Sequence, residues 1–393
     1  MCETGMVLSE LSYMIRHTKK FARKHRVMTP LAQFHASSYQ MPCPYGVVLV
    51  MSPWNYPFML TVDPLIDAIA AGNTVMVKPS AYSPYTSQII EEILTNVFPK
   101  EYVSVILGGR KENQALLEEK FDYIFFTGSP YVGHEVMSKA SVHLTPVTLE
   151  LGGKSPCIVD ETANIKLAAR RIVFGKYLNL GQTCVAPDYI YVHTSVKDKL
   201  IHEVIQEIKR QYQDLSSYGK IINEKHFDRI SKLLDPNKIV YRGKTNRETL
   251  KIEPTIMDHV SWDDAVMQEE IFGPIMPILT FTNFEDCINI IKEKPSPLAL
   301  YLFSSNKTRV DMVTHSVPYG GGCINDTIIH LATSNMPFGG VGNSGMGGYH
   351  GKEGFKTFTH YKSIVDKKTW LDLPIRYQPY SKLYDKLIHI FLR

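Results

Sequence analysis

Gly46-Val47-Val48-Leu49-Val50-Met51 is a short, apolar and largely β-branched run, of the kind that a buried parallel strand shows. A helix-like segment at 60–71 and a second strand at 74–78 follow it. The alternation continues through a helix at 88–97, a strand at 103–107, a helix at 115–120 and a strand at 123–126. Strands and helices in this order predict a doubly wound parallel sheet.

The same alternation extends outward from this core. Before it, we expect an amphipathic helix at 6–25 and a proline-containing connector at 29–44. After it, a second α/β series has strands at 156–159 and 189–192, helices at 167–178 and 196–212, and a surface helix around 226–234. Further strands are expected at 252–256, 275–281 and 299–303, and the glycine-rich stretch 339–348 is typical of a tight loop. We therefore expect an α/β protein with two domains.

Composition excludes several classes of protein. The chain has 393 residues, is 44% hydrophobic and 21% charged, and carries a formal net charge of +4, which is ordinary for a globular enzyme. A basic cluster at 19–26 is interpreted as a solvated helix face rather than a nucleic-acid site. The six cysteines show no CxxC or Cys/His metal spacing, which predicts reduced thiols, no metal site and a cytoplasmic location. No run approaches the ~20 apolar residues that a membrane helix needs.

Two residues carry a chemical signal. Cys184 stands among small and polar neighbours in Gly181-Gln182-Thr183-Cys184-Val185-Ala186-Pro187, which leaves its sulfur reachable, as a nucleophile requires. Glu150 precedes two glycines, which let a carboxylate swing and approach a substrate closely. A thiol and a mobile carboxylate together suggest covalent capture followed by hydrolysis.

These residues also carry a family resemblance. Leu149-Glu150-Leu151-Gly152-Gly153-Lys154-Ser155-Pro156 with Gly181-Gln182-Thr183-Cys184 resembles the aldehyde dehydrogenase superfamily, and the flanking Gly175-Lys176-Tyr177 and Ala186-Pro187-Asp188-Tyr189 resemble its class 3 branch. The resemblance runs from about Glu10 to about Phe358, without the N-terminal helices that the family carries before this point. It implies oxidation of medium-chain aliphatic or aromatic aldehydes with NAD or NADP, usually by a homodimer.

The resemblance implies roles for three catalytic residues. Cys184 would add to the aldehyde carbonyl and later carry the acyl group as a thioester. The backbone N–H of Cys184 and the side-chain amide of Asn55 would stabilise the oxyanion, and such a donor typically contributes about 2.7–4 kcal/mol. Glu150 would activate the water that hydrolyses the thioester, which favours release of a free acid over transfer to a thiol.

No Gly-x-Gly-x-x-Gly follows a strand, so the usual dinucleotide-binding motif is absent. The cofactor contacts are implied by the resemblance instead. Phe126-Thr127-Gly128-Ser129 followed by Gly133 would bind the pyrophosphate, and Lys78-Pro79-Ser80 would bind the adenosine ribose. Ala81 stands where many members have a glutamate that repels a 2′-phosphate, so use of NADP beside NAD is expected. The full set of expected contacts is Trp54, Lys78, Ser80, Gly128, Ser129, Gly133, Leu151, Glu270 and Phe272.

The substrate channel is the least determined part of the site. Aromatic residues and one histidine are candidates for an apolar tunnel, although aromatic residues more often belong to a core. The candidates are Tyr56, Tyr177, His330 and Phe338.

The resemblance also implies the domain boundaries. Residues 1–149 would bind NAD(P), with 29–44 contributing to oligomerisation, and residues 150–334 would form the catalytic domain. Residues 335–393 would return to the cofactor domain, add an oligomerisation strand and end in a tail. That tail would either pack or gate substrate entry, or make peripheral membrane contact.

Two other functions stay open at this point. The chain could be a truncated, weakly active paralogue that acts as a binding or structural protein, which failure to bind either nucleotide would indicate. It could also be a thiol esterase that uses Cys184 without a cofactor, which ester turnover without aldehyde oxidation would indicate.

Overall fold

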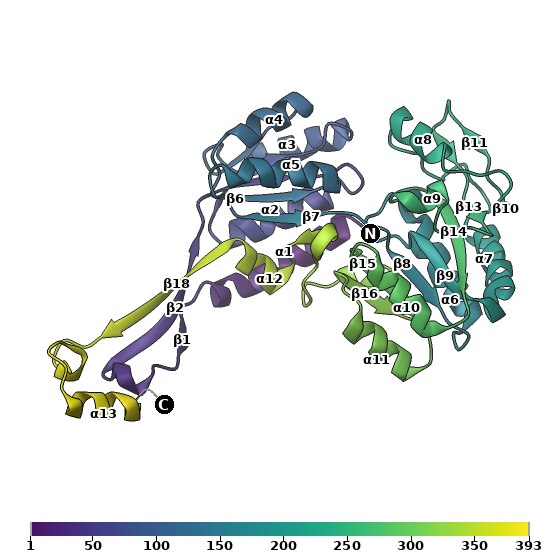
Figure 1. Ribbon diagram of the computed structural model, residues 1–393. Coiled ribbons are helices and arrows are strands. Elements are labelled where there is room, and N and C mark those ends of the chain that lie inside the picture. The colour runs from purple at the N-terminus through teal and green to yellow at the C-terminus, as the bar shows by residue number, and fades with distance from the viewer. Residues whose placement is uncertain (1, 392–393) are drawn as a thin grey trace.

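The computed structural model describes residues 2–391. Two α/β bodies lie side by side, and a thin antiparallel arm projects from the first of them (Figure 1). Within the described residues, no helix is both long enough and apolar enough to cross a membrane.

The first body is built on a six-stranded sheet with the order β17-β7-β6-β3-β4-β5. Its strands are β3 (Val47–Met51), β4 (Thr74–Lys78), β5 (Val103–Val105), β6 (Tyr123–Thr127), β7 (Val147–Glu150) and β17 (Gly345–Met346). β3 pairs in parallel with β4 on one side and with β6 on the other, which confirms the predicted doubly wound sheet. The strand order therefore reverses between β3 and β6, and the carboxyl ends of strands form a ligand crevice at such a point.

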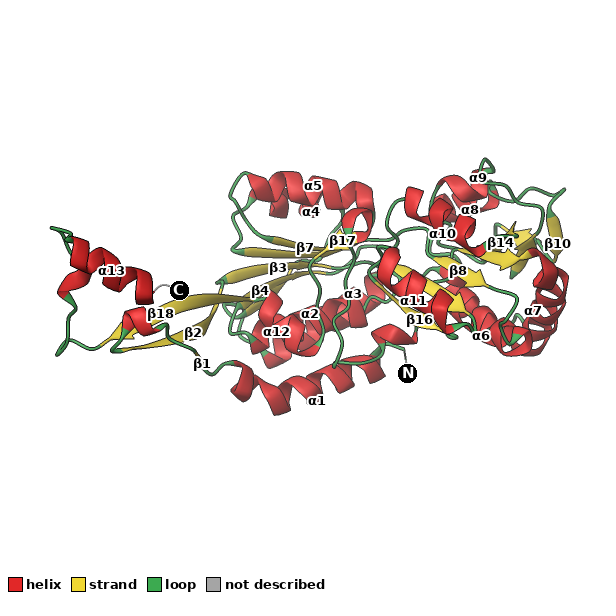
Figure 2. Cartoon of the chain, turned by 60° about the horizontal axis from the view of Figure 1, so that its bottom comes forward, coloured by secondary structure: helices red, strands yellow, loops and turns green. Residues whose placement is uncertain are grey.

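Alternate residues of β3 explain why both faces of this sheet are covered. Val48 and Val50 share a core with residues of α2, whereas Leu49 and Met51 share another with residues of α4 and α5. One face carries α1 (Thr4–Phe21), α2 (Met59–Ala70), α3 (Pro84–Val97) and α12 (Gly351–Thr357), and the other carries α4 (Arg110–Glu118) and α5 (Pro130–Ser141) (Figure 2).

The second body is built on a seven-stranded sheet with the order β10-β13-β14-β9-β8-β15-β16, parallel except at β10. Its strands are β8 (Pro156–Val159), β9 (Tyr189–His193), β10 (Ile239–Tyr241), β13 (Thr255–Met257), β14 (Ile275–Phe281), β15 (Ala299–Phe303) and β16 (Gly321–Ile324). Its helices are α6 (Ile165–Tyr177), α7 (Lys197–Gln211), α8 (Glu224–Ser231), α9 (Ala265–Gln268), α10 (Phe284–Glu293) and α11 (Lys307–Ser316).

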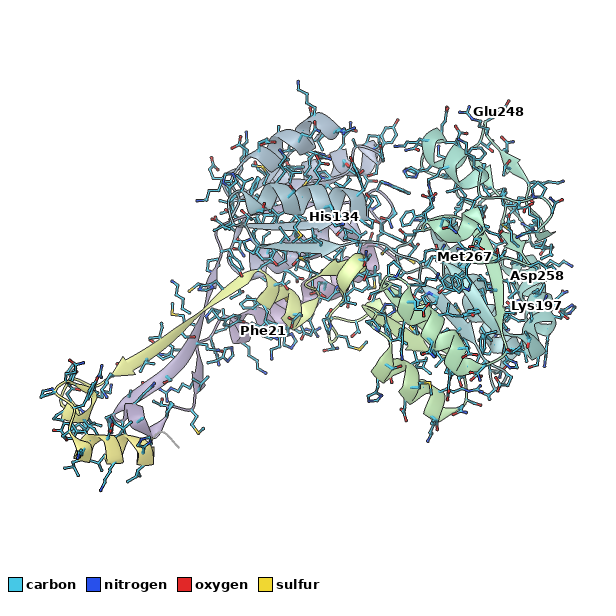
Figure 3. All side chains as sticks on the ribbon, in the orientation of Figure 1. Phe21, His134, Lys197, Glu248, Asp258 and Met267 are labelled. Carbon is cyan, nitrogen blue, oxygen red and sulfur yellow. The ribbon has the colours of Figure 1, made fainter. Side chains whose placement is uncertain are left out.

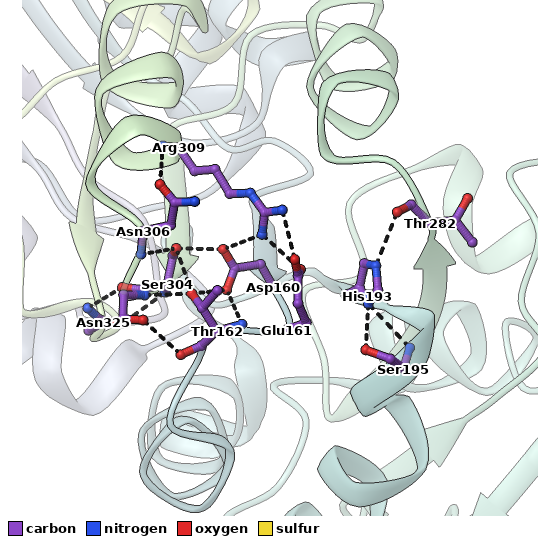
Figure 4. Close-up of polar contacts among 11 residues, drawn as sticks. Asp160, Glu161, Thr162, His193, Ser195, Thr282, Ser304, Asn306, Arg309 and Asn325 are labelled. Carbon is purple, nitrogen blue, oxygen red and sulfur yellow. Dashed lines mark hydrogen bonds and ion pairs between the residues drawn. The ribbon is translucent and has the colours of Figure 1, made fainter.

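A closed polar network occupies the carboxyl ends of β8 and β15 (Figure 4). Asp160, which is completely buried, accepts hydrogen bonds from Ser304 Oγ at 2.5 Å and Arg309 Nη1 at 2.9 Å. The same guanidinium pairs with Glu161. These groups satisfy one another, so this network leaves none of them free to bind a ligand.

The arm consists of three antiparallel strands. β2 (Ala36–Pro44) pairs with β18 (Thr359–Lys367) along its whole length, and β1 (His25–Val27) pairs with residues 38–40 of β2. α13 (Lys382–Phe391) lies at the tip, beside the short turn η1 (Leu31–Gln33) (Figure 1). The connector expected at 29–44 therefore contains a regular strand over 36–44. Pro42 and Pro44 obscure this strand in the sequence, and they are tolerated because β1 leaves that stretch of edge unpaired.

Two other expectations need correction. The single strand expected at 252–256 is divided by Pro254 into β12 (Lys251–Ile252), which forms a hairpin with β11 (Thr245–Asn246), and β13. β7 and β16 are not predicted from the sequence, since each has only four residues. β18 lies within 335–393, where a strand is expected without stated bounds.

Candidate active site

A cavity of about 680 Å³ lies between the two bodies. Pro53 and Trp54, which follow β3, line it from the first body, and so do Gly128 and Ser129, which follow β6. The second body contributes the segment around Met267, which lies on the side that faces the first body (Figure 3). The crevice predicted by the strand order is therefore part of a cavity that both bodies share.

Cys184 lies on the wall of this cavity, in the loop that joins α6 to β9. Asn179, Leu180 and Gly181 all have positive φ, at 49°, 57° and 71°, and these three left-handed residues turn the chain sharply out of the helix. Burial, the Glu270 carboxyl and the Glu150 carboxyl together raise the pKa of the Cys184 thiol to about 12. The free protein therefore holds a neutral thiol that is poised close to two carboxyl groups.

Asn55 is fixed to the same loop. Its Nδ2 donates a hydrogen bond to the Gln182 carbonyl at 3.1 Å, and Asn179 Nδ2 donates to the Asn55 carbonyl at 2.8 Å. One amide hydrogen of Asn55 is used in this way, which leaves the second to point to a ligand. Both Asn55 and Cys184 line the cavity, so an amide donor and the thiol share one space.

Glu150 ends β7 and also lines the cavity. It is 2% exposed, and neither of its carboxyl oxygens has a hydrogen-bond partner within the described residues. Burial raises the pKa of Glu150 well above its usual range. A carboxyl group in this condition is neutral, and it becomes a base only after it loses its proton.

The expected cofactor residues fall into two groups. The first group lines the cavity and consists of Trp54, Gly128, Ser129, Leu151, Glu270 and Phe272. Ser129 Oγ accepts a hydrogen bond from the Val132 N–H at 3.4 Å, so the N-terminus of α5 begins at the cavity wall. Free backbone N–H groups at such an end suit a phosphate.

The second group lies outside the cavity. Gly133 packs against the Leu151 side chain, and a side chain at Gly133 would meet it at 2.7 Å. Lys78 is the last residue of β4, and its Nζ donates hydrogen bonds to the carbonyls of Gly108 at 2.6 Å and Pro79 at 2.9 Å. Ser80 Oγ accepts from the Tyr82 N–H at 3.2 Å. Lys78 and Ser80 therefore lie along the same carboxyl edge of the sheet, one strand beyond the crevice.

The candidate channel residues separate clearly. Phe338 lines the cavity, whereas Tyr56 lies behind it, with its hydroxyl 2.8 Å from Thr183 Oγ1. His330 is not part of the cavity wall, and its ring packs 6.1 Å from that of Phe338. Tyr177 is not part of the cavity wall. Its side chain is 1% exposed and its hydroxyl donates to the Thr255 carbonyl in the interior of the second body, so the structure does not bring it to the other channel candidates.

Other residues of the wall escape sequence reasoning. Asn343 lies in the glycine-rich stretch 339–348 and Tyr349 directly follows it, and that stretch marks a tight loop without indicating which side chains it presents. Lys154 and Arg229 also line the cavity. Lys154 stands within the Glu150 motif, and that place is the signal in the sequence that could have identified it.

Comparisons with known proteins show the family of this chain. Residues 2–364 match the sequence model of the Aldehyde dehydrogenase family. The chain is 48% identical to the 4,4'-diaponeurosporen-aldehyde dehydrogenase of Staphylococcus aureus, over all of this chain and 86% of the relative. It is 43% identical to the mouse protein named aldehyde dehydrogenase, dimeric NADP-preferring, over 92% of this chain and 81% of that one.

Solved structures agree as well. The substrate-bound Staphylococcus aureus AldH superimposes with a TM-score of 0.97 at 48% identity, and the alignment covers all of this chain and 86% of that one. An aldehyde dehydrogenase of Mycobacterium tuberculosis complexed with NAD+ gives a TM-score of 0.83 at 29% identity, covering 91% and 76%. This chain therefore belongs to the aldehyde dehydrogenase family.

Proposed function

We propose that the chain oxidises medium-chain aliphatic or aromatic aldehydes to carboxylic acids, with NAD+ or NADP+ as the hydride acceptor. The observation that carries this proposal is one cavity whose wall holds Cys184, Glu150 and Asn55 and also the crevice at the ends of β3 and β6. The N-terminus of α5 and the Glu270 carboxyl fit the phosphate and ribose groups of such a nucleotide. When bound, the nucleotide accepts a hydride from the substrate carbon.

Cys184 performs the first step. Its thiol loses a proton to solvent, the resulting thiolate sulfur forms a bond to the carbonyl carbon, and the electron pair of the opened C=O bond leaves a negative charge on the oxygen. The free amide hydrogen of Asn55 and the Cys184 N–H stabilise this charge. Loss of the hydride then leaves an acyl group on sulfur as a thioester.

Glu150 performs the second step. Its ionised carboxylate takes a proton from water, the hydroxide attacks the thioester carbon, and the carbon–sulfur bond breaks to release the acid and the thiolate. Because neither oxygen of Glu150 has a hydrogen-bond partner in the part of the chain that the structure describes, both remain available to the water.

The choice between NAD+ and NADP+ depends on the residues at the carboxyl end of β4, next to the crevice. Ala81 follows Lys78 and Ser80, and its side chain cannot repel a 2′-phosphate. The mouse relative is named as NADP-preferring, and the Mycobacterium tuberculosis structure holds NAD+. We therefore propose that this chain uses both nucleotides.

The arm suggests how the chain assembles. β18 is an edge strand of nine residues, and an unpaired edge of this length is a template for a strand of another chain. We propose a homodimer in which 29–44 and the segment after 335 form the interface, 1–149 bind the nucleotide and 150–334 carry the catalytic cysteine. The mouse relative is named as dimeric. The free cysteines favour a cytoplasmic location.

The tail lies far from the cavity of its own chain. α13 exposes Leu383 and Ile390 beside Lys382 and Lys386, and Trp370 is exposed nearby. Apolar and basic residues on one surface suit either a packing role in the dimer or peripheral membrane contact. Flotation with anionic vesicles would separate these roles, since only membrane contact carries the protein into the lipid fraction.

Kinetics of two variants test the catalytic assignment. We expect Cys184→Ala to abolish NAD(P)H formation from aliphatic and aromatic aldehydes. Glu150→Gln should keep a first burst of NAD(P)H and lose steady turnover by about 10²-fold or more. Wild-type ester hydrolysis without aldehyde oxidation would refute the proposed function, and equal loss of burst and turnover would refute the role of Glu150.

A further inference from the structure

The Lys154 ammonium lies in a cradle of three acceptors. It pairs with the Asp188 carboxylate and donates to the carbonyls of Val266 at 3.0 Å and Glu269 at 2.8 Å. Its side chain is 21% exposed. Lys154 thus links the loop after Glu150 to a segment more than a hundred residues away in the sequence.

Asp188 completes the connection from the cysteine loop. Its Oδ1 accepts a hydrogen bond from the Ile271 N–H at 2.8 Å, while its Oδ2 meets Lys154. The Asp188 N–H donates to the Ser155 carbonyl at 2.8 Å, which fixes its own backbone. The aspartate is 4% exposed, so nearly all of its hydrogen-bonding capacity is directed to these partners.

Both groups act on the residues that flank Glu270. Lys154 holds the carbonyl before it, Asp188 holds the N–H after it, and Arg229 Nη1 donates to the Glu270 carbonyl at 3.2 Å. The Glu270 backbone is therefore held from three directions, while its side chain is left to face the cavity.

The Glu270 carboxyl lies directly against Gly152. A side chain at Gly152 would collide with both oxygens of this carboxyl group, so it would displace the Glu270 carboxyl from its present position. Gly152 is two residues from Glu150, and Lys154 is two residues further on. The position of Glu270 relative to the catalytic base therefore depends on how segment 266–271 is attached to this loop.

We propose that Lys154 and Asp188 are positioning residues that hold Glu270 in register with Cys184 and Glu150, so that its carboxylate meets the nicotinamide ribose. This inference rests on the proposed function. The ion pair joins three segments that the sequence keeps apart, at 149–154, 184–188 and 266–271, and its hydrogen bonds end on the backbone beside the residue that would hold the ribose. The hydrogen bonds of the pair thus act on the Glu269 carbonyl and the Ile271 N–H, the two backbone groups on either side of Glu270.

Nucleotide kinetics of Lys154→Met and Asp188→Asn test the proposal. Each variant removes one charge at nearly constant volume. We expect the KM for NAD+ to rise about tenfold or more, because the Glu270 segment loses a charged hydrogen-bond partner. Ester hydrolysis by Cys184 without nucleotide should stay within about twofold of wild type, since it does not use Glu270. Asp188→Asn keeps an acceptor for the Ile271 N–H, and it serves as the test if Lys154→Met does not fold.

A matched control exists in the same body. Lys197 and Asp258 form an ion pair at 2.8 Å, and their side chains are 18% and 9% exposed, close to the 21% and 4% of Lys154 and Asp188. This pair lies on the outer side of the second body, away from Met267 (Figure 3). Lys197→Met should therefore lower stability by a similar amount and leave the KM for NAD+ unchanged.

A double-mutant cycle with Glu270→Gln decides whether Lys154 acts through Glu270. We expect Lys154→Met to raise the KM for NAD+ in the wild-type background and to have little further effect beside Glu270→Gln. Additive effects, an unchanged KM, or an equal loss of ester hydrolysis would overturn the proposal. A wild-type protein without NAD(P)-dependent aldehyde oxidation would instead refute the proposed function.

Discussion

A cluster of buried acids lies where α1, α2 and α12 meet. Glu10, Asp63, Asp67 and His350 are 2%, 0%, 0% and 4% exposed, respectively. Asp67 accepts one long hydrogen bond, from the His350 N–H at 3.4 Å, and its Oδ1 has no partner within the described residues. Burial, with Glu10 and Asp63 nearby, holds the pKa of Asp67 well above the usual range of an aspartate.

This arrangement predicts that Asp67→Asn stabilises the protein at alkaline pH. The folded chain keeps a proton on Asp67 that the unfolded chain releases above about pH 3.9, so the free energy of unfolding falls as pH rises. An amide carries no charge to bury, and its N–H groups can donate to Oε2 of Glu10, which accepts no hydrogen bond within the described residues and lies 3.8 Å from His350 Nδ1. We expect a gain of about 1–3 kcal/mol at pH 8.5, the usual cost of an unsatisfied buried polar group, and a smaller gain at pH 5.

Urea unfolding of both proteins at pH 5 and pH 8.5 measures this difference. Asp160→Asn is the matched control. Asp160 is also 0% exposed, but Arg309 and Ser304 satisfy it, so the same substitution should destabilise by about 1–3 kcal/mol. If Asp67→Asn lowers stability at pH 8.5 as Asp160→Asn does, the reasoning about unpaired acids is wrong.

Three further outcomes are expected. Because burial raises the pKa of Glu150, steady turnover should increase from pH 6 to pH 9, and Glu150→Gln should flatten this profile of kcat against pH. Ala81→Glu should lower kcat/KM for NADP+ by about tenfold relative to NAD+, since the new carboxylate would lie near a 2′-phosphate, and an unchanged ratio would place the adenosine elsewhere. Gly181→Ala should cost about 1 kcal/mol or more in thermal unfolding and reduce turnover, because Gly181 has φ of 71° and a side chain there would strike the Gly273 carbonyl; unchanged turnover would mean that this turn does not place Cys184.

The sequence predicts the parts of the fold that depend on local pattern. Val48 to Met51 are buried on alternate faces, so the strand appears as a continuous apolar run that periodicity detects. β2 shows the opposite case. It lies in an exposed arm and contains Pro42 and Pro44, and its regularity comes from pairing with β18, more than three hundred residues away. Pattern alone could not indicate that partner.

The candidate site also contains residues that the sequence predicts and residues that it does not. Cys184, Glu150 and Asn55 stand in short motifs with their own chemical character, and the structure brings all three to one cavity. Tyr177 stands close to Cys184 in the sequence, yet its side chain points into the interior of the second body. Its direction is set by α6, the helix that carries it.

Lys154 shows what a motif leaves unsaid. Its position beside Glu150 invites a role near the base, but its partners lie on the cysteine loop and on the backbone beside Glu270. The three acids and the histidine of the α1–α2–α12 cluster likewise look like ordinary polar residues in the sequence, and only the packing of three helices buries them. In both cases the sequence gives the residue type. Its contribution to the free energy of unfolding depends on whether distant residues supply hydrogen-bond partners once the residue is buried. The partly buried ammonium of Lys154 has three partners and so holds the segments of the site together. The buried carboxyl of Asp67 accepts a single long hydrogen bond, and it therefore makes the stability of the protein depend on pH.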